Sequence, residues 1–217
     1  MQFKIRRSAL TPWLALVFAL ALTMQSGVTQ AASAGGRLRF VHAVPGAPAV
    51  DVAIDNQSAV LSLDYATNTR YLNLAPGNHA IAVMATGTTS AVFKGQVTLA
   101  AGQSQTAVLQ GTANALELGL YDDDLGPLAP GNIRFTAIHA IKDAPAVDIL
   151  KADGSPLIQG LKYGAPYGGF DVPAAAASIL VVPAGGNPSG AIIKADGLSL
   201  VAGTFNTLVA VGTVTGS

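Results

Sequence analysis

A ten-residue phrase occurs twice in this chain and is the feature that most constrains its fold. HAVPGAPAVD occupies His42–Asp51, and HAIKDAPAVD occupies His139–Asp148. The flanking residues correspond as well, since Tyr65 follows the first phrase and Tyr163 follows the second at a similar distance. Self-similarity over this length indicates that one structural unit is present in two tandem copies.

Within each copy, apolar and polar residues alternate over short runs, as at Val50, Val52 and Ile54. Turn-forming sequences separate such runs at intervals of about ten residues. Among them, DNQ at Asp55 and KADG at Lys151 occur at the same point after each phrase and predict hairpin turns. No segment sustains a helical period. The pattern predicts an all-β fold of two tandem β-sandwiches, each with roughly seven strands.

The first 34 residues have the pattern of a signal peptide. A basic start at Lys4–Arg7 precedes an apolar run, and Ala32–Ala34 provides small residues for cleavage. Cleavage after Ala31 and an uncleaved anchor are alternatives. We expect an exported protein of the periplasm, cell surface or extracellular space, with no membrane span after cleavage.

The expected domain order follows from these observations. A signal peptide at 1–34 precedes a first β-sandwich repeat at 35–121, a linker at 122–131 and a second β-sandwich repeat at 132–217. The linker contains several carboxylates, glycines and prolines, which are typical of a connector.

Charge and cysteine content exclude several classes of protein. The chain has 12 Lys and Arg against 12 Asp and Glu, so removal of a basic signal peptide leaves a slightly negative mature protein. Its basic residues are scattered and form no patch for nucleic acid. The absence of cysteine excludes disulfides and thiolate metal sites, so burial of apolar side chains must hold the fold together.

The arrangement R-x-x-H-A-x-x-x-A-P-A-V-D-V, then L-x-Y, then A-G-x-x-x-T-x-V, resembles the bacterial secreted family catalogued as domain of unknown function 4397, which often occurs in tandem. The residues that carry the resemblance are His42, Pro48, Asp51, Tyr65 and Gly102 in the first copy, and His139, Pro145, Asp148, Tyr163 and Gly203 in the second. The resemblance implies immunoglobulin-like β-sandwiches at or beyond the cell envelope, with no established activity.

The repeated phrase is a candidate structural motif. Its residues are His42, Pro48 and Asp51 in the first copy and His139, Pro145 and Asp148 in the second. If the phrase is a hairpin, His42 faces Asp51 and can hydrogen-bond its carboxylate. However, His42 is in phase with Phe40, whereas Asp51 is out of phase with its apolar neighbours, and directly opposed residues share a face.

Two explanations of this mismatch remain open. Either a bulge near the prolines corrects the phase, or the two strands lie in different sheets. We slightly favour a bulge or corner, with His42 turned partly inward and bonded to backbone or to Asp51. Pro48 and Pro145 fix φ and suit a strand edge or turn.

Catalytic, cofactor-binding and metal-binding residues are not expected. One His and one Asp per copy are too few for a nucleophilic triad or a zinc site, and His79 has no counterpart in the second copy. One alternative is a secreted hydrolase that uses His42 or His139 with the nearby Asp. Another is a calcium-stabilised adhesion protein that uses Asp122–Asp124, although the spaced pattern of a calcium loop is missing and a solvated linker is favoured.

Tyr65 and Tyr163 form the candidate ligand surface, because matched tyrosines can provide aromatic platforms. Packing of these tyrosines in the core or at an edge is the structural alternative. The sequence therefore predicts an exported, non-catalytic structural or binding module. Its partner is expected to be an unknown envelope or extracellular protein or polysaccharide.

Overall fold

The structure is a computed structural model that describes residues 34–174, 177–198 and 200–213. The expected signal peptide therefore lies outside the described residues except for Ala34. Across the described ranges, no helix combines the length and apolar character needed to cross a membrane.

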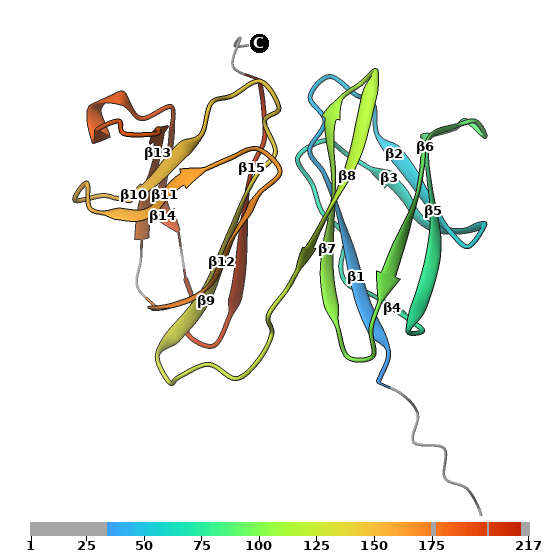
Figure 1. Ribbon diagram of the computed structural model, residues 1–217, viewed down its shortest axis with the longest axis horizontal. Helices are drawn as coiled ribbons and strands as arrows, with labels where there is room; N and C mark the ends of the chain where they lie inside the picture. Colours follow the sequence, from blue (N-terminus) through green and yellow to red (C-terminus); the bar gives the residue numbers. More distant parts are fainter. Residues whose placement is uncertain (1–33, 175–176, 199, 214–217) are drawn as a thin grey trace, which may run out of the picture. The chain divides into compact units, whose positions relative to one another are not determined.

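The described residues form 15 strands in four sheets, with no α-helix among them (Figure 1). The first half consists of β1 (Gly36–His42), β2 (Val50–Ile54), β3 (Gln57–Leu63), β4 (Leu72–Leu74), β5 (Gly77–Ala85), β6 (Ala91–Leu99), β7 (Ser104–Thr112) and β8 (Ala115–Asp122). The second half consists of β9 (Asn132–His139), β10 (Val147–Lys151), β11 (Pro156–Leu161), β12 (Pro166–Pro173), β13 (Ala177–Pro183), a 3-10 turn (Pro188–Gly190), β14 (Ile193–Leu198) and β15 (Phe205–Ala210). The prediction of an all-β fold is confirmed.

The two halves share a strand order. The sheets of the first half run β4-β1-β7-β8 and β3-β2-β5-β6, and those of the second run β12-β9-β15 and β11-β10-β13-β14. In both halves the first strand pairs in parallel with a late strand, β1 with β7 and β9 with β15. The halves differ at one edge, because within the described ranges no strand takes the place of β8 beside β15.

The repeated phrase carries the chain from one sheet to the facing sheet. β1 has β4 and β7 on its two edges, and β2 has β3 and β5 on its edges. With both edges of each strand occupied, His42 and Asp51 cannot be partners across a ladder. The hairpin interpretation of the phrase is therefore wrong, and the alternative with the strands in different sheets is correct.

The predicted turns after the phrases are confirmed. Asp55 and Asn56 connect β2 to β3 with φ values of 52° and 63°, which is the left-handed geometry of a tight hairpin turn. The chain turns between β10 and β11 at 152–155, where Gly154 has a φ of 82°.

Each half encloses its own apolar core between its two sheets. The core of the first half includes Leu38, Phe40, Val52, Ile81, Val97 and Leu99. The core of the second half includes Phe135, Val147, Ile149, Ile158, Ile179 and Val181. The two cores use inward-facing residues of both sheets, as in facing β-sheets generally.

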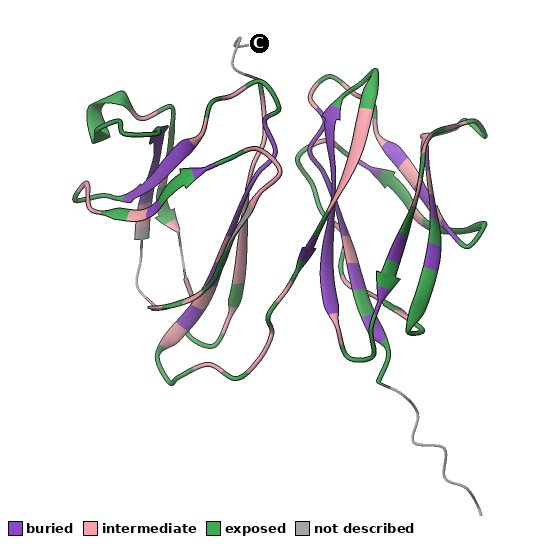
Figure 2. Cartoon of the chain, viewed as in Figure 1, coloured by how far each residue is buried: buried purple, intermediate pink, exposed green. Residues whose placement is uncertain are grey.

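A further apolar cluster joins the halves. Val41 and Val108 of the first half pack with Ile138 of the second, together with Tyr121 and Ala140. β7 is consequently buried on both faces along nearly all of its length (Figure 2), whereas β1 is buried on both faces only from Phe40 to His42. Burial on two faces extends to polar side chains of β7, since Gln105, Thr106 and Gln110 are buried beside the short apolar run 107–109.

Candidate functional site

His42, the histidine of the first repeated phrase, is buried in the interior. His42 is fully buried at the end of β1, and its Nε2 lies 3.1 Å from the carbonyl oxygen of Pro48. The backbone N–H of Val44 donates to its Nδ1 over 3.3 Å. Because Nδ1 accepts, the proton must lie on Nε2, which donates to Pro48. The ring thus ties together both ends of the segment that crosses between the sheets.

The second half repeats this arrangement. His139 is fully buried, its Nε2 lies 3.1 Å from the carbonyl oxygen of Pro145, and the N–H of Ile141 donates to its Nδ1 over 3.2 Å. The expectation that the histidine turns inward and bonds to backbone is therefore correct in both copies. Both ring nitrogens are used in each case, so neither ring has a nitrogen left to act as a general base or metal ligand.

The matched tyrosines pack on these histidines. The ring of Tyr65 lies edge-on to His42 with centroids 6.0 Å apart, and Tyr163 lies edge-on to His139 at 6.5 Å. The Tyr163 hydroxyl also donates to Glu117 of β8 over 2.8 Å, and Glu117 forms an ion pair with Lys142. Both tyrosines are half-buried. A ligand-binding role for them stays a prediction.

Asp51 and Asp148, the aspartates of the two repeated phrases, bind a different part of the fold from the histidines. Asp51 accepts from the N–H of Ser62 over 2.8 Å and from the hydroxyl of Thr86 over 2.9 Å. These hydrogen bonds hold the pKa of Asp51 below its usual value. Asp148 accepts from the N–H groups of Gly160 and Gly185, each over 2.7 Å.

The first partner is equivalent in the two halves. Ser62 has a φ of 50° and Gly160 a φ of 65°, and each lies beside a register shift against the preceding strand. Each phrase aspartate therefore binds the exposed N–H of a left-handed bulge residue. This contact is a structural role for the motif, and it replaces the predicted bond between histidine and aspartate.

A histidine–aspartate pair does occur, but at residues that the sequence pattern did not single out as partners. His79 of β5 is buried, and its Nδ1 lies 2.7 Å from Oδ2 of Asp55, which is in the β2–β3 turn. Its Nε2 lies 2.8 Å from the carbonyl oxygen of Ala75. The carboxylate raises the pKa of His79, and the imidazole lowers that of Asp55. With both nitrogens bonded, this pair has no free position for proton transfer to a substrate.

A polar cluster centred on Arg39 lies where the halves meet. Arg39 Nε donates to the Thr106 hydroxyl, and Arg39 Nη2 donates to the hydroxyl of Thr207 in β15, each over 2.8 Å. Asp123 lies 3.4 Å from Arg39 Nη2 and accepts from the hydroxyls of Tyr71 and Thr106 over 2.8 and 2.6 Å. We call these five residues the Arg39 cluster.

The Arg39 cluster is largely buried, since the side chains of Arg39 and Asp123 are 20% and 5% exposed. The guanidinium carbon of Arg39 lies 4.9 Å from the centroid of the Tyr71 ring, a cation–π arrangement. Burial, with the Asp123 carboxylate as a second cause, raises the pKa of Tyr71 to about 12. Every charged or hydroxyl group of the cluster thus has a fixed partner.

Asp123 corrects one interpretation of the linker. Its side chain is only 5% exposed, so it is not part of a solvated connector. The carboxylates of Asp122–Asp124 also diverge: Asp122 accepts from Gln103 and Gln105, whereas Asp124 binds Gly126 and Arg134. Within the described residues, no group of three or more acidic or histidine side chains could hold a metal ion.

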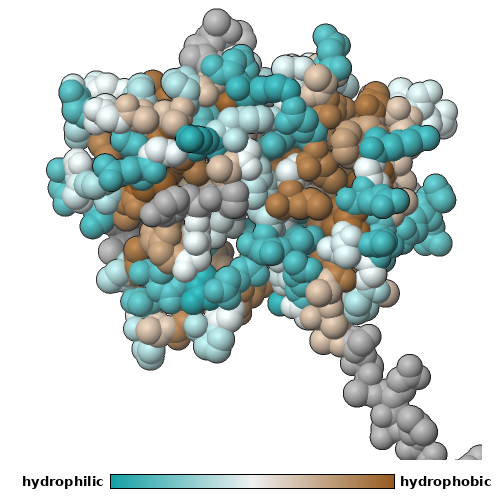
Figure 3. All heavy atoms as spheres, in the orientation of Figure 1, coloured by the Kyte–Doolittle hydropathy of each residue, from teal (hydrophilic) through white to brown (hydrophobic). Residues whose placement is uncertain are grey.

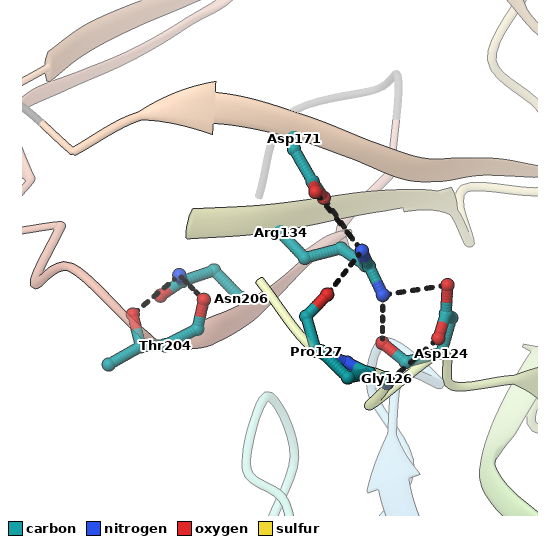
Figure 4. A network of polar contacts seen from close by, with 7 residues as sticks. All are labelled: Asp124, Gly126, Pro127, Arg134, Asp171, Thr204 and Asn206. Atoms are coloured by element: carbon teal, nitrogen blue, oxygen red, sulfur yellow. Dashed lines mark hydrogen bonds and ion pairs between the residues drawn. The ribbon is translucent and has the colours of Figure 1, made fainter. Parts of the chain in front are cut away.

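A second network surrounds Arg134 of β9 (Figure 4). Its guanidinium binds Asp171 and Asp124, each at 2.7 Å, and donates to the carbonyl oxygens of Asp124 and Pro127 over 3.5 Å. The charged partners raise the pKa of Arg134. These bonds fasten the start of the inter-half segment to β9. The guanidinium carbon also lies 6.0 Å from the centroid of the Phe205 ring.

The two networks border a common cavity of about 190 Å³. Its walls include Arg39, Tyr71 and Asp123 from the first network, and Arg134, Phe205 and Asn206 from the second half. Phe205 is 39% exposed, which is high for a large apolar side chain. The cavity combines fixed charges, amide and hydroxyl groups with one accessible aromatic ring, a composition suited to binding a polar ligand.

Comparison with known families identifies the family of this chain. The model of the family described as "Domain of unknown function (DUF4397)" matches residues 36–150, which is more than half of the chain. The chain belongs to the DUF4397 family. The matched range contains all eight strands of the first half and, in the second half, β9 and all of β10 except its last residue.

No curated protein matches the chain. The chain is similar to structures titled "Alpha-glucan binding by a streptococcal virulence factor" and "Alpha-glucan recognition by family 41 carbohydrate-binding modules from streptococcal virulence factors", each with 14% identity and a TM-score of 0.26. The similarity covers 80% and 82% of this chain and 93% and 94% of those chains.

A third similar structure is titled "The Bacillus anthracis TIE protein" and has 14% identity and a TM-score of 0.26. That match covers 83% of this chain and 34% of the other. TM-scores at this level carry no argument about the ligand, so the function must be argued from the contacts of this DUF4397 chain itself.

The DUF4397 match includes the first phrase, whose residues hold the fold, but the Arg39 cluster depends on β15 outside the match. Thr106 and Thr207 both occupy the T of the pattern A-G-x-x-x-T-x-V, so their equivalence is evident from the sequence. Their convergence on one arginine is not, because Arg39 and Thr207 are brought together only by packing of β1 beside β15.

Proposed function

We propose that this DUF4397 chain is an exported, non-catalytic binding module of the periplasm, cell surface or extracellular space. In this proposal each half is an immunoglobulin-like β-sandwich, and the second half is a further copy of the family unit. The main support is the repeated contact set of His42 and His139, which uses both ring nitrogens on backbone in each copy. Groups so fully occupied serve a scaffold better than they serve chemistry.

The proposed ligand surface is the cavity between the Arg39 cluster and Phe205. A polysaccharide is the ligand that its chemistry favours. The accessible ring of Phe205 can pack against the apolar face of a sugar ring, while Asn206 and the half-exposed carboxylate of Asp124 can bind hydroxyl groups. Arg134 is fixed by its ion pairs, so the walls are preorganised and little entropy is lost on binding.

The test uses the full chain, exported from a bacterial host, and a panel of neutral and acidic bacterial polysaccharides. Retention on each polysaccharide and isothermal titration calorimetry measure the affinity. Phe205→Ala should weaken binding by about tenfold, as expected for loss of one aromatic contact. The matched control is Leu61→Ala, because Leu61 is 71% exposed and does not line the cavity.

Several outcomes would contradict the proposal. If the chain retained an envelope protein and bound no polysaccharide, the ligand would be a protein and the proposed polysaccharide would be wrong. Release of hydrolysis products that depends on His42 or His139 would replace the binding module with the hydrolase. Equal effects of Phe205→Ala and Leu61→Ala would remove the cavity from the proposal.

A further inference from the structure

A hollow lies in the core of the second half, at a point where the corresponding side chains of the first half are buried. This hollow, of about 420 Å³, lies between the two sheets of the second half. Its walls are almost entirely apolar and include Phe135, Leu157, Phe170, Ile179, Leu198 and Leu200. This volume falls within the roughly 300–1,000 Å³ that is usual for ligand cavities.

The first half provides an internal comparison. Val97 and Leu99 are 0% and 1% exposed at the end of β6, whereas Leu198, the last residue of the equivalent strand β14, and Leu200 beyond it are both partly exposed. At this point apolar side chains fill the core of the first half. The corresponding side chains of the second half line a hollow.

One substitution between the halves explains the difference. Leu99 lies against Gly36, so closely that a Cβ on this glycine would lie 2.9 Å from Leu99 Cβ. Gly36 pairs with Leu74 in β4, and in the second half Ile133 pairs with Val172 in β12 at the same register position. Ile133 has a fully buried side chain. A branched side chain at this position leaves less room for Leu200 than Gly36 leaves for Leu99.

The rim of the hollow is polar and asymmetric. Lys151 is exposed at the end of β10 and is joined at the rim by Ser178 and Asp153. The Asp153 carboxylate accepts from both the N–H and the hydroxyl of Ser155, over 2.8 and 2.6 Å, so its charge is partly satisfied within its own turn. No ion pair within 4 Å involves Lys151 in the described part of the chain, although its charge is among the causes that lower the pKa of Asp153, so the mouth of the hollow carries an ammonium group beside a carboxylate.

We propose that this hollow is a binding site for an anionic amphiphile, with its hydrocarbon chain between the sheets and its anionic group at Lys151. Two aromatic rings, Phe135 and Phe170, stand 5.6 Å apart in the wall and give the chain a firm apolar contact. The site is separate from the cavity at Phe205 and does not depend on the proposed polysaccharide binding.

The experiment uses the full chain and dodecanoate as the probe, with dodecanol as its neutral counterpart. Displacement of a fluorescent dansyl-labelled fatty acid measures affinity, and the rise in melting temperature with dodecanoate confirms binding to the folded state. Val172→Trp should fill the hollow and weaken dodecanoate binding by at least about tenfold. The matched control is Leu74→Trp, at the equivalent position in the first half, which should leave the affinity unchanged.

Lys151→Gln tests the anionic group. It should weaken binding of dodecanoate about three- to tenfold, as expected for loss of one partly exposed charge contact, and leave dodecanol unaffected. Circular dichroism melts confirm that each variant is folded. Absence of probe binding to the unmodified chain, or equal losses in Val172→Trp and Leu74→Trp, would overturn the site. Unchanged dodecanoate affinity in Lys151→Gln would overturn the assignment of the anionic group.

Discussion

The imidazole of His79 donates to the carboxylate of Asp55 through Nδ1, at 2.7 Å. Its other nitrogen faces the carbonyl oxygen of Ala75 at 2.8 Å. Two acceptors are matched by two N–H groups, so this geometry favours the imidazolium form of His79. The second half has no histidine at the equivalent position, so this ion pair is specific to the first half.

The His79–Asp55 pair predicts a window of greatest stability. The pKa of His79 is raised above its ordinary 6.5, so its contribution is complete below that value and is lost as the pH rises through the folded pKa. The pKa of Asp55 is lowered from 3.8, so its contribution is complete above that value and is lost as the pH falls through the folded pKa. The pair therefore stabilises most between these two ordinary values.

Thermal melts across this pH range measure the effect. In His79→Gln the melting temperature should fall most at about pH 5–6, and the difference from the unmodified chain should shrink above the folded pKa of His79. Gln keeps one donor for one of the two acceptors. A difference that is constant from pH 5 to about pH 9 would show that the charge of His79 makes no contribution.

The phrase histidines should behave as structural residues. His42→Phe keeps the ring but leaves the N–H of Val44 and the carbonyl of Pro48 without their partner, which should cost about 2–4 kcal/mol of unfolding free energy. His139→Phe should cost a similar amount, because its two contacts have nearly the same lengths. Urea unfolding measures both.

Tyr65→Phe is the control for this prediction, because it keeps the ring contact with His42 and should change the free energy by less than about 0.5 kcal/mol. A stable His42→Phe variant that has lost an enzymatic activity would instead make the histidine catalytic.

The two phrase aspartates should differ in their contribution to stability. Asp148 is buried and accepts from two backbone N–H groups, so Asp148→Ala should cost about 2–4 kcal/mol. Asp51 is more exposed, and Thr86 can bind water after Asp51→Ala, so that change should cost clearly less. Chemical unfolding of the two variants side by side decides the order, and an equal or reversed order would contradict it.

The Arg39 cluster predicts an unusual tyrosine titration. Tyr71 should ionise near pH 12, because burial and the Asp123 carboxylate disfavour the phenolate. Asp123→Asn removes the negative charge and should lower the pKa of Tyr71 toward its ordinary value of 10.0. Ultraviolet absorbance of tyrosinate measures the titration, and Tyr71→Phe identifies the component that belongs to this residue. A component that does not move in Asp123→Asn would show that the carboxylate has no influence on Tyr71.

Apolar side chains are also exposed elsewhere on the surface. Figure 3 shows hydrophilic and apolar residues interspersed on one face, with apolar residues visible in both halves. Leu61, Val92, Ile192 and Val201 are among the exposed apolar side chains. Isolated exposed apolar side chains of this kind are normal for a folded protein.

The sequence by itself determined the features that depend on neighbouring residues. Alternation and turn formers predicted an all-β chain, and the repeat of DNQ and KADG predicted turns that the structure contains. The phase mismatch between His42 and Asp51 already indicated that a simple hairpin was unsafe. Local pattern decides such features because backbone geometry couples residues only a few positions apart.

Only the tertiary structure decided which side chains meet. Asp123 looked like part of a solvated linker, but its partners Arg39 and Tyr71 come from β1 and from the segment before β4. The partner of Asp55 proved to be His79, and Arg39 reaches Thr207 in the other half. These contacts are set by the order of strands in the sheets and by the packing of one sheet on another. Since both depend on burial of apolar surface across the whole chain, no short stretch of sequence contains them.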